Sequence, residues 1–218
     1  MLSLTRPVTV VRDGHDVIAH YGSVATEVAV CVKHAGVVQR PELGVLELSG
    51  RPDSLAHLLD TALGKLAPLV GAAVQVGGAW CAHPAQDRAL IVAPQGSIGR
   101  WRRLVQRSIV SGWHVTCDDV PGMRAVSLIG PRAGRVLVQA GVGALPMPGA
   151  ATAGALGDAP AVVVCEASDC YLLLVEAAPD SSAWQALDAA GAPYGLAQVG
   201  HDAYDRLSAA ARPARLAV

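Results

Sequence analysis

Two short segments contain residue types that could catalyse a reaction, and GGAWCAHP is the first. Cys81 and His83 lie two positions apart there, so an extended backbone would direct both side chains to one face. A cysteine becomes a nucleophile when a neighbouring base or cation favours its thiolate. No third residue that would orient the histidine can be identified, and a buried cysteine beside a loop histidine is the simpler interpretation.

The second kind of chemistry would come from acidic residues. Asp118 and Asp119 in TCDDVPG suit acid–base or metal chemistry, although adjacent acids before Pro-Gly are more typical of a turn. In VVVCEASD, Glu166 ends an apolar run, and Asp169 follows in a turn. A carboxylate leaving such a run is costly unless it reaches solvent or receives hydrogen bonds from a ligand. His83, Glu166 and Asp169 are the candidate catalytic groups, and a strand-end Glu166 facing water is the alternative.

The metal-binding residue types show no ligand spacing. The seven histidines are dispersed, with neither an H-x-x-x-H nor an H-E-x-x-H pair. The five cysteines are odd in number and scattered, which matches neither a disulfide framework nor a four-cysteine zinc site. We therefore predict no metal, and we expect most cysteines to be small buried residues.

Composition narrows the classes of partner. The chain has 218 residues, of which 52% are hydrophobic, so it can bury a large core. Its 17 basic and 18 acidic residues provide no electrostatic footprint for nucleic acid or an anionic membrane. No apolar run reaches the length of about 18 residues that spans a bilayer, and the N-terminus becomes charged before a signal-like core develops. We expect a cytoplasmic protein that binds neither nucleic acid nor membrane.

Strand and helix patterns alternate along the chain. Strands are predicted at 45–50, 88–93, 123–130, 161–167 and 170–177, and helices at 52–66, 96–112, 131–141, 180–191 and from 201. Segment 141–160 is predicted to be a long loop. Repeated strand–helix units indicate one pseudo-duplicated α+β domain over 1–218, with helices packed on a mainly antiparallel sheet and lobes of about 1–120 and 121–218.

The order of several motifs resembles a known family, the glycine cleavage system T protein, a tetrahydrofolate-dependent aminomethyltransferase. The segments that carry the resemblance are HYGSVATEVAVCVKHAGVVQRPELGVLELSG, RPDSLAHLL, DRALIVAP, SLIGPRAGRVL, CYLLLVEA and WQALDAAGAPYGLAQVGHDAYDRL. Within the first segment, the residues in register are Tyr21-Gly22-Ser23, Glu27, Gly36, Gly44 and Gly50. The resemblance implies the family's folate-binding-domain fold without its C-terminal barrel.

The polar positions depart from the family pattern. The family's pocket motif, Asp-hydrophobic-Ser-His-Met-Gly, falls on the run from Gln39 to Gly44, where only Leu43 and Gly44 correspond. The catalytic aspartate expected after Gly77-Gly78 is missing, since the chain continues Ala-Trp-Cys-Ala. The pterin-binding glutamate is expected just before Asp-Cys-Tyr, and Glu166 is the nearest carboxylate. The ligand pocket implied in this way comprises Tyr21, Leu43, Trp80, Cys81, Glu166 and Tyr171.

Two functions are compatible with these features. One is a tetrahydrofolate-linked one-carbon transferase-like protein with degenerate catalytic residues, or one recruited to other small-molecule chemistry; its partner is a small ligand. The other is a non-catalytic structural subunit, similar to the gamma subunit of heterotetrameric sarcosine oxidase, acting in a homodimer or a larger oxidase or transferase assembly. A closed pocket containing Leu43, Trp80, Glu166 and Tyr171 would favour the first, and a large exposed apolar patch would favour the second.

Overall fold

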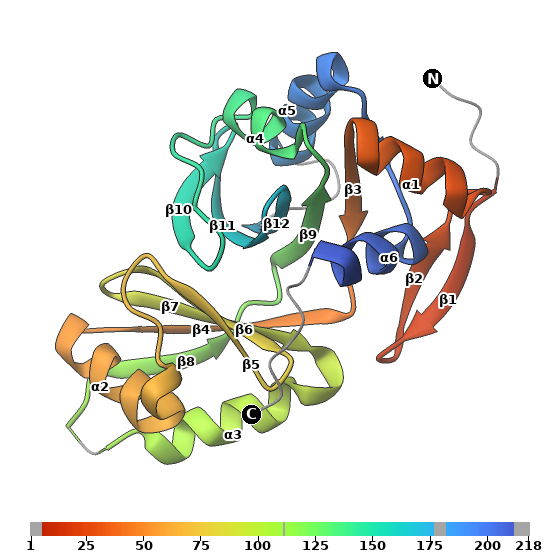
Figure 1. Ribbon diagram of the computed structural model, residues 1–218. Helices are drawn as coiled ribbons and strands as arrows, with labels where there is room; N and C mark the ends of the chain where they lie inside the picture. The colour runs from red at the N-terminus through yellow and green to blue at the C-terminus, as the bar shows by residue number, and fades with distance from the viewer. Residues whose placement is uncertain (1–5, 111, 177–181, 212–218) are drawn as a thin grey trace.

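A computed structural model of the chain describes residues 6–110, 112–176 and 182–211, and within them two sheets form the body of the protein (Figure 1). The first sheet has five strands in the order β5-β6-β7-β4-β8, all antiparallel. Its strands are β4 (Leu43–Gly50), β5 (Ala73–Val76), β6 (Ala79–Ala85), β7 (Arg88–Pro94) and β8 (Val115–Asp119).

The second sheet has six strands in the order β10-β11-β12-β9-β3-β13. Its strands are β3 (Ala35–Gln39), β9 (Met123–Ile129), β10 (Ala151–Leu156), β11 (Ala159–Ala167), β12 (Cys170–Glu176) and β13 (Leu196–Gln198). The pairing of β13 with β3 is parallel, and the other pairings in this sheet are antiparallel.

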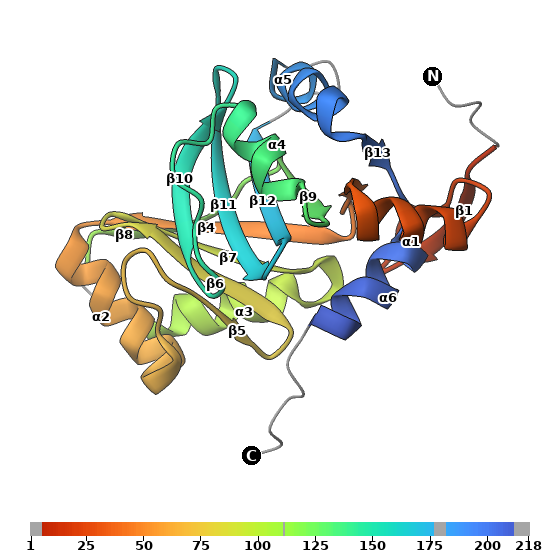
Figure 2. The same ribbon diagram turned by 45° about the horizontal axis from the view of Figure 1, so that its top comes forward.

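Alternating side chains place the two sheets face to face between two layers of helices. On β7, Leu90 and Val92 enter the core between the sheets, whereas Ile91 faces the helices. On β12, Leu172 enters the same inter-sheet core and Leu173 faces the opposite helix layer. The helices α2 (Pro52–Leu63) and α3 (Gln95–Ser108) cover the first sheet, and α4 (Ala133–Gln139) and α5 (Ser182–Gly191) cover the second (Figure 2).

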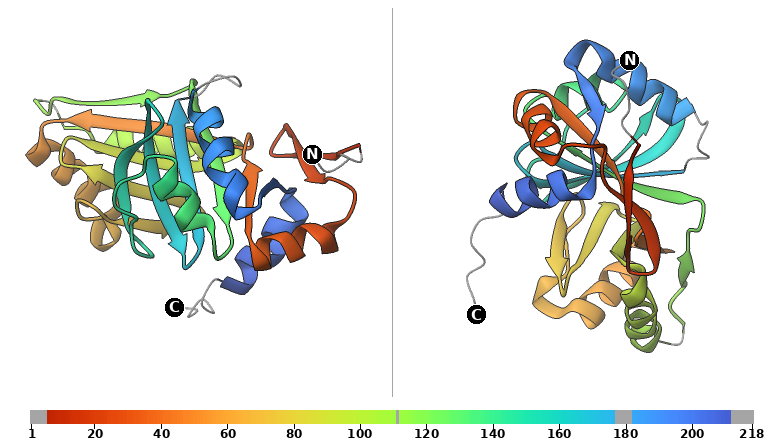
Figure 3. Two further views of the ribbon diagram at one scale, coloured as in Figure 1. Left: turned by 90° about the horizontal axis from the view of Figure 1, so that it is seen from above. Right: turned by 90° about the vertical axis from the view of Figure 1, so that its right-hand side faces the viewer.

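A further group of elements packs beside the second sheet. It consists of the hairpin β1 (Val8–Arg12) and β2 (His15–His20) with helices α1 (Val24–Lys33) and α6 (His201–Ala211) (Figure 3). Ser23 caps α1 by accepting a hydrogen bond from the backbone N–H of Thr26. Buried Glu27 accepts backbone hydrogen bonds from Tyr21 (2.6 Å) and from Gly200 (2.7 Å), immediately before α6. One carboxylate therefore ties the start of α1 to the start of α6.

The α+β fold expected from the sequence is confirmed, and most of the predicted elements are present. Helix α2 begins at Pro52, in the first-turn position that the sequence predicted. Helix α3 ends at Ser108 and not at Gly112. Helical spacing predicts that Leu104 shares a buried face with Trp101 and Val105, but Leu104 is 39% exposed, whereas the other two are buried. The sequence also predicts Asp180 or Ser181 as the N-cap of α5, and both lie outside the described residues.

Two features of the organisation differ from the sequence-based expectation. Part of the expected loop 141–160 forms β10, which pairs with β11 through residues 151–156. The chain passes from the first sheet to the second between β8 and β9, near residue 120, but residues 35–39 also belong to the second sheet. The two sheets are therefore not built from consecutive halves of the chain, because the chain runs from β3 in the second sheet directly into β4 in the first.

The structure also answers two questions from the sequence: whether the cysteines form disulfides, and whether a helix could span a membrane. All five cysteines are free; Cys117 is half-buried and the other four are buried. Among residues 6–110, 112–176 and 182–211, no helix has the length and apolar character that a membrane span requires.

Candidate functional site

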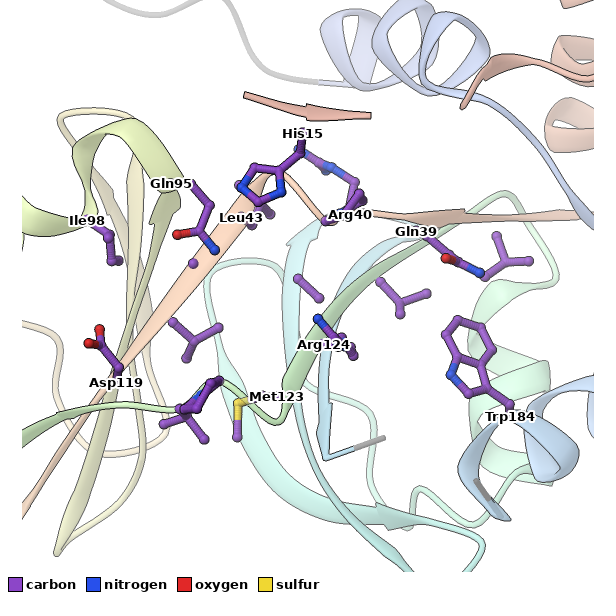
Figure 4. A pocket seen from close by; sticks show the side chains of 18 of the residues that line it. His15, Gln39, Arg40, Leu43, Gln95, Ile98, Asp119, Met123, Arg124 and Trp184 are labelled. Carbon is purple, nitrogen blue, oxygen red and sulfur yellow. The ribbon is translucent and has the colours of Figure 1, made fainter. Parts of the chain in front are cut away.

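A cavity of about 550 Å³ opens where β3 passes into β4, between the edges of the two sheets (Figure 4). Its volume is in the range of typical small-molecule pockets. Figure 4 shows Gln95, Ile98 and Asp119 towards one side of this inter-sheet cavity and Gln39 and Trp184 towards the other, with Arg124 between them. Residues from both sheets and from α3 and α5 therefore share one surface.

The lining of the inter-sheet cavity is mixed in polarity. Leu43 and Met123 are among its apolar residues, and Trp184 is half-buried against the core under α5. Arg102 of α3 forms an ion pair with Asp119 at the end of β8. This pair is exposed, so solvent screens it. The cavity can hold a small molecule with polar groups, but it presents no buried carboxylate beside a nucleophile among the described residues.

The β3–β4 connection also carries a second, more buried polar cluster. Gln39 lines the cavity and is exposed, whereas Arg40 both lines the cavity and extends its guanidinium over Tyr204 of α6. The Arg40 Nε donates to Glu42 Oε1 at 2.6 Å, and its Nη1 donates to Ser127 Oγ of β9 at 3.0 Å. Glu42 is 5% exposed and Ser127 is 0% exposed, so the Glu42 side of this ion pair is buried, whereas the Arg40 side chain is 15% exposed towards the cavity.

The network continues into α6 through His201. Its Nε2 lies 3.2 Å from Glu42 Oε2, and its Nδ1 lies 3.2 Å from the backbone oxygen of Ile18 in β2. Each ring nitrogen of His201 therefore faces an oxygen that can accept a hydrogen bond. The first residue of α6 is thereby fixed to the β3–β4 connection and to the β1–β2 hairpin.

Tyr204 extends the same network to the β11–β12 hairpin. The Arg40 guanidinium carbon lies 4.6 Å from the centre of the Tyr204 ring, within cation–π range. The Tyr204 hydroxyl donates to Glu166 Oε2 at 2.8 Å, and the Cys170 thiol approaches the same oxygen at 3.5 Å. We call the set Arg40, Glu42, Ser127, Glu166, Cys170, His201 and Tyr204 the α6 network.

The ionisation of the α6 network follows from its burial and its pairing. Burial alone would raise the pKa of Glu42, but the hydrogen bond from His201 and the charge and hydrogen bond of Arg40 lower it to about 2. Burial and the nearby Glu166 carboxylate raise the pKa of Tyr204 well above its usual value. At neutral pH the network therefore contains an ionised Glu42 paired with Arg40 and a protonated Tyr204 that donates to Glu166.

Comparison with solved structures identifies the architecture. Over 94% of this chain, the fold matches the glycine cleavage system aminomethyltransferase T from Bartonella henselae, with a TM-score of 0.74 and 14% identity. The chain has the aminomethyltransferase-like fold. It spans 58% of the length of the Bartonella protein. No protein-family model and no curated protein sequence matches the chain.

A second solved structure matches over most of its own length. A chain of the heterotetrameric sarcosine oxidase from Corynebacterium sp. U-96 is similar to this protein with a TM-score of 0.64 and 19% identity. The match covers 80% of this chain and 93% of the sarcosine oxidase chain. The aminomethyltransferase-like fold thus accounts for nearly all of that chain.

The expected pocket residues are dispersed across this fold. Leu43 lines the inter-sheet cavity, and the Tyr21 hydroxyl donates at 3.0 Å to Gln198, which also lines it. Trp80 packs on the inter-sheet core, and buried Cys81 faces the helices on the other side of the same sheet. Tyr171 is buried in the core under α4 and α5. These side chains do not share one cavity.

The three candidate catalytic groups are also separated. His83 is buried, its Nδ1 lies 3.1 Å from the backbone oxygen of Pro68, and its Nε2 has no hydrogen-bond partner. Burial raises the pKa of neighbouring Cys81 to about 12, which opposes formation of a thiolate. Asp169 is an exposed turn residue with a φ of 58°. Glu166 is partly buried and is bonded within the α6 network.

The polar residues that the structure does bring together were missed by the sequence reasoning, apart from Glu166. Arg40 and Glu42 were visible as two charges within an apolar segment, and His201 and Tyr204 lie three positions apart at the start of the last helix. That spacing puts both on one helix face. Among the described residues, no group of three or more His, Cys, Asp or Glu side chains is arranged to hold a metal ion.

Proposed function

We propose that this protein is a non-catalytic subunit with an aminomethyltransferase-like fold that works within a larger assembly. The observation that carries the proposal is the closed state of the α6 network. Arg40 and Glu42 stand where the resemblance places the polar pocket motif, and their charged groups bind Ser127, His201 and each other. A substrate that used Glu42 or the bonded edge of Arg40 would have to displace these internal partners.

An exposed apolar surface supports a role in assembly. Leu69 is 81% exposed and Met147 is 76% exposed, on two turns joined by backbone hydrogen bonds around Ala72 and Ala150. Leu66 and Val70 extend this turn patch. Clustered apolar side chains of this kind are typical of protein interfaces. The turn patch lies away from the residues that line the inter-sheet cavity.

The sarcosine oxidase comparison is consistent with the same role. Nearly the whole of one chain of that heterotetramer has this fold, so the fold can constitute a subunit by itself. By analogy, we infer that the partners of this protein form an oxidase or transferase assembly. The identity of its substrate would then be determined by residues of the partner subunits.

A complex isolated under native expression tests the proposal. We expect affinity-tagged protein to elute at a mass above that of its own monomer or dimer, with a partner in fixed stoichiometry. The isolated chain should show no aminomethyl transfer to tetrahydrofolate, and Leu69→Asp with Met147→Asp should dissociate the complex. Val138→Asp, at another exposed apolar position, is the matched control. Efficient aminomethyl transfer by the isolated monomer would refute the non-catalytic role.

Tetrahydrofolate is the cofactor implied by the resemblance, and two places in the structure can be tested for its fit: the surroundings of Glu166 and the inter-sheet cavity. Beside Glu166 it does not fit, because Tyr204 and Cys170 already donate to the carboxylate and the Tyr204 ring fills the adjoining space. The inter-sheet cavity has sufficient volume and offers both amide and charged groups. Its size and polarity favour a second candidate function, in which the protein binds a reduced folate or another small ligand there without transforming it.

Calorimetric titration with 5-methyltetrahydrofolate tests this second candidate. Binding in the inter-sheet cavity should be weakened at least about tenfold by Trp184→Ala, which removes the aromatic wall. Trp113→Ala is the control, because Trp113 lies in the core under α2 and α3. Absence of binding to the wild-type protein, or equal weakening by both variants, would eliminate folate binding in this cavity.

A further inference from the structure

Tyr204 fills a slot between Arg40 and Glu166 that has the features of a binding site for a planar molecule. We infer that Tyr204 acts as a built-in occupant, which takes the place that a planar ligand would fill between these two groups. The inference rests on the closed α6 network that also supports the proposed non-catalytic role. The inference adds that the space between Arg40 and Glu166 is still shaped for a ligand, and that only the phenol ring of Tyr204 fills it.

The contacts of Tyr204 are those that a bound heterocycle would make. Its flat face lies against the Arg40 guanidinium, with 4.6 Å between the guanidinium carbon and the ring centre. Its edge donates a hydrogen bond to Glu166 Oε2 at 2.8 Å. One face is therefore met by a cation, and one edge by a carboxylate. Arginine stacking and carboxylate pairing are common means of holding planar N–H donors.

The walls of the slot have partners besides Tyr204. Arg40 is held by Glu42 at 2.6 Å and by Ser127 at 3.0 Å. Glu166, at the end of β11, accepts from the Cys170 thiol at 3.5 Å as well as from Tyr204. Removal of the phenol ring would therefore leave a guanidinium and a carboxylate facing a void of about one aromatic ring.

Helix α6 also has anchors other than Tyr204. His201 contacts Glu42 and the Ile18 carbonyl, each at 3.2 Å, and the Gly200 N–H donates to Glu27 at 2.7 Å. A side chain at Gly200 would meet the backbone of Ala19, so the chain approaches β2 closely at this point. We therefore expect α6 to remain docked when the Tyr204 ring is removed.

The geometry defines the chemical class of ligand for the emptied slot. It should be a planar, monocyclic heterocycle with N–H donors on one edge, because the carboxylate accepts and the void matches one ring. The compound 2-aminopyrimidin-4-one has this shape and two adjacent donors. It is also the donor-bearing ring of a pterin, which explains why the wild-type chain cannot place a pterin beside Glu166.

Titration of four proteins with 2-aminopyrimidin-4-one tests the inference. We expect saturable binding to Tyr204→Ala and none to the wild type or to Tyr204→Phe, whose ring still fills the slot. The double variant Tyr204→Ala/Glu166→Gln should bind at least about tenfold more weakly, because a charge-assisted hydrogen bond is lost. Benzene, which fills the void without donating, should also bind at least about tenfold more weakly than the heterocycle.

Thermal melting and circular dichroism provide a second test, which remains informative if Tyr204→Ala does not fold by itself. Tyr204→Leu keeps an apolar side chain of intermediate size, and thermal melting in 2-aminopyrimidin-4-one should be raised for Tyr204→Ala but not for Tyr204→Leu. If Tyr204→Ala is unfolded alone, the heterocycle should restore its circular dichroism, and it should not restore that of the double variant. Failure to bind or to restore Tyr204→Ala would overturn the inference, as would equal binding to the wild type.

The outcomes remain separate from those of the proposed functions. Binding in the slot should be insensitive to Trp184→Ala, which alters the inter-sheet cavity. Complex formation through the turn patch should be insensitive to Tyr204→Ala once the variant is shown to be folded. The experiments can therefore disprove the inference about Tyr204 without affecting the proposed subunit role. They can also disprove the subunit role without affecting the inference.

Discussion

The inter-sheet cavity and the α6 network meet at the same β3–β4 connection and share Arg40, yet their other polar residues differ in exposure and pairing. The cavity is lined by exposed polar groups such as Gln39 and by the exposed Arg102–Asp119 pair. The α6 network holds Glu42 and His201 at 5% and 2% exposure. One stretch of chain thus presents a solvated surface on one side and a desolvated ion pair on the other.

This difference shows how a fold can retain a ligand-sized cavity while the polar groups beside it are engaged in internal bonds. Asp119 and Arg124 in the inter-sheet cavity remain accessible to a ligand, whereas Glu42 and His201 in the α6 network are bound to internal partners. A buried pair contributes less to net stability than its geometry suggests, because both ions lose their hydration. It is nevertheless costly to break, since the remaining partner is left buried and unpaired. Substitutions should therefore have large effects in the network and small effects in the cavity.

Glu42→Gln should have the largest effect on stability. It leaves the Arg40 charge without its ionic partner and replaces by an NH2 donor one of the two oxygens that face Arg40 and His201. We expect the free energy of unfolding to fall by roughly 3 to 5 kcal/mol, the range for breaking a buried ion pair. Urea unfolding followed by tryptophan fluorescence measures this change. A loss no greater than that of a surface substitution would show that the network is not closed in solution.

Protonation of Glu42 at low pH should destabilise the wild-type protein in the same way as the substitution. The pKa of Glu42 is lowered from 4.5 to about 2 in the folded protein, so its contribution to stability is complete above pH 4.5 and is lost as the pH falls towards 2. The loss is at most about 3 kcal/mol. Urea unfolding of the wild type and of Glu42→Gln between pH 7 and pH 2 isolates this component. The two proteins should converge at low pH, and parallel curves would contradict the assignment.

Tyr204→Phe should have an intermediate effect. The substitution retains the ring over Arg40 but removes the hydroxyl that donates to Glu166. We expect a loss of roughly 1 to 3 kcal/mol, because a partly buried carboxylate loses a hydrogen bond. Tyr194→Phe is the matched control, since the Tyr194 hydroxyl makes no side-chain hydrogen bond among the described residues. Equal losses in chemical denaturation would remove the Tyr204 hydroxyl from the α6 network.

Asp119→Asn should have the smallest effect. Its carboxylate pairs with Arg102 on one wall of the inter-sheet cavity, but the side chains are 51% and 36% exposed. Solvent screening limits the expected loss to roughly 1 kcal/mol or less, and salt should reduce it further. Unfolding at low and high ionic strength measures both. A salt-independent loss as large as that of Glu42→Gln would mean that the cavity wall is as desolvated as the network.

Several elements could be predicted because their determinants are local. The spacing of Leu55, Leu58 and Leu59 behind Pro52 encodes both the start and the buried face of α2. The apolar run of β7 likewise indicates a strand, since it faces a core on both sides. By contrast, β10 is rich in alanine and glycine, which are poor strand formers. It becomes a strand because β11 supplies backbone partners.

The candidate site was predictable only in part. The departure of Gln39 to Glu42 from the expected motif was apparent in the sequence and correctly directed attention to the β3–β4 connection. Its consequence was not apparent, because Glu42 and His201 are 159 positions apart. Trp80, Cys81 and Tyr171 were expected in one pocket, but strand alternation and sheet packing place them in three different cores.

The sequence alone determined the α+β class, the approximate positions of the amphipathic helices and the replacement of the polar pocket motif, because these depend on residue type and short-range periodicity. The tertiary structure decided which polar groups meet. Docking of α6 brings Arg40 and Glu42 into a network with His201 and Tyr204, and it places Tyr204 against Glu166. The physical reason is that desolvation and long-range pairing arise only when distant segments pack together, so no local pattern can specify them.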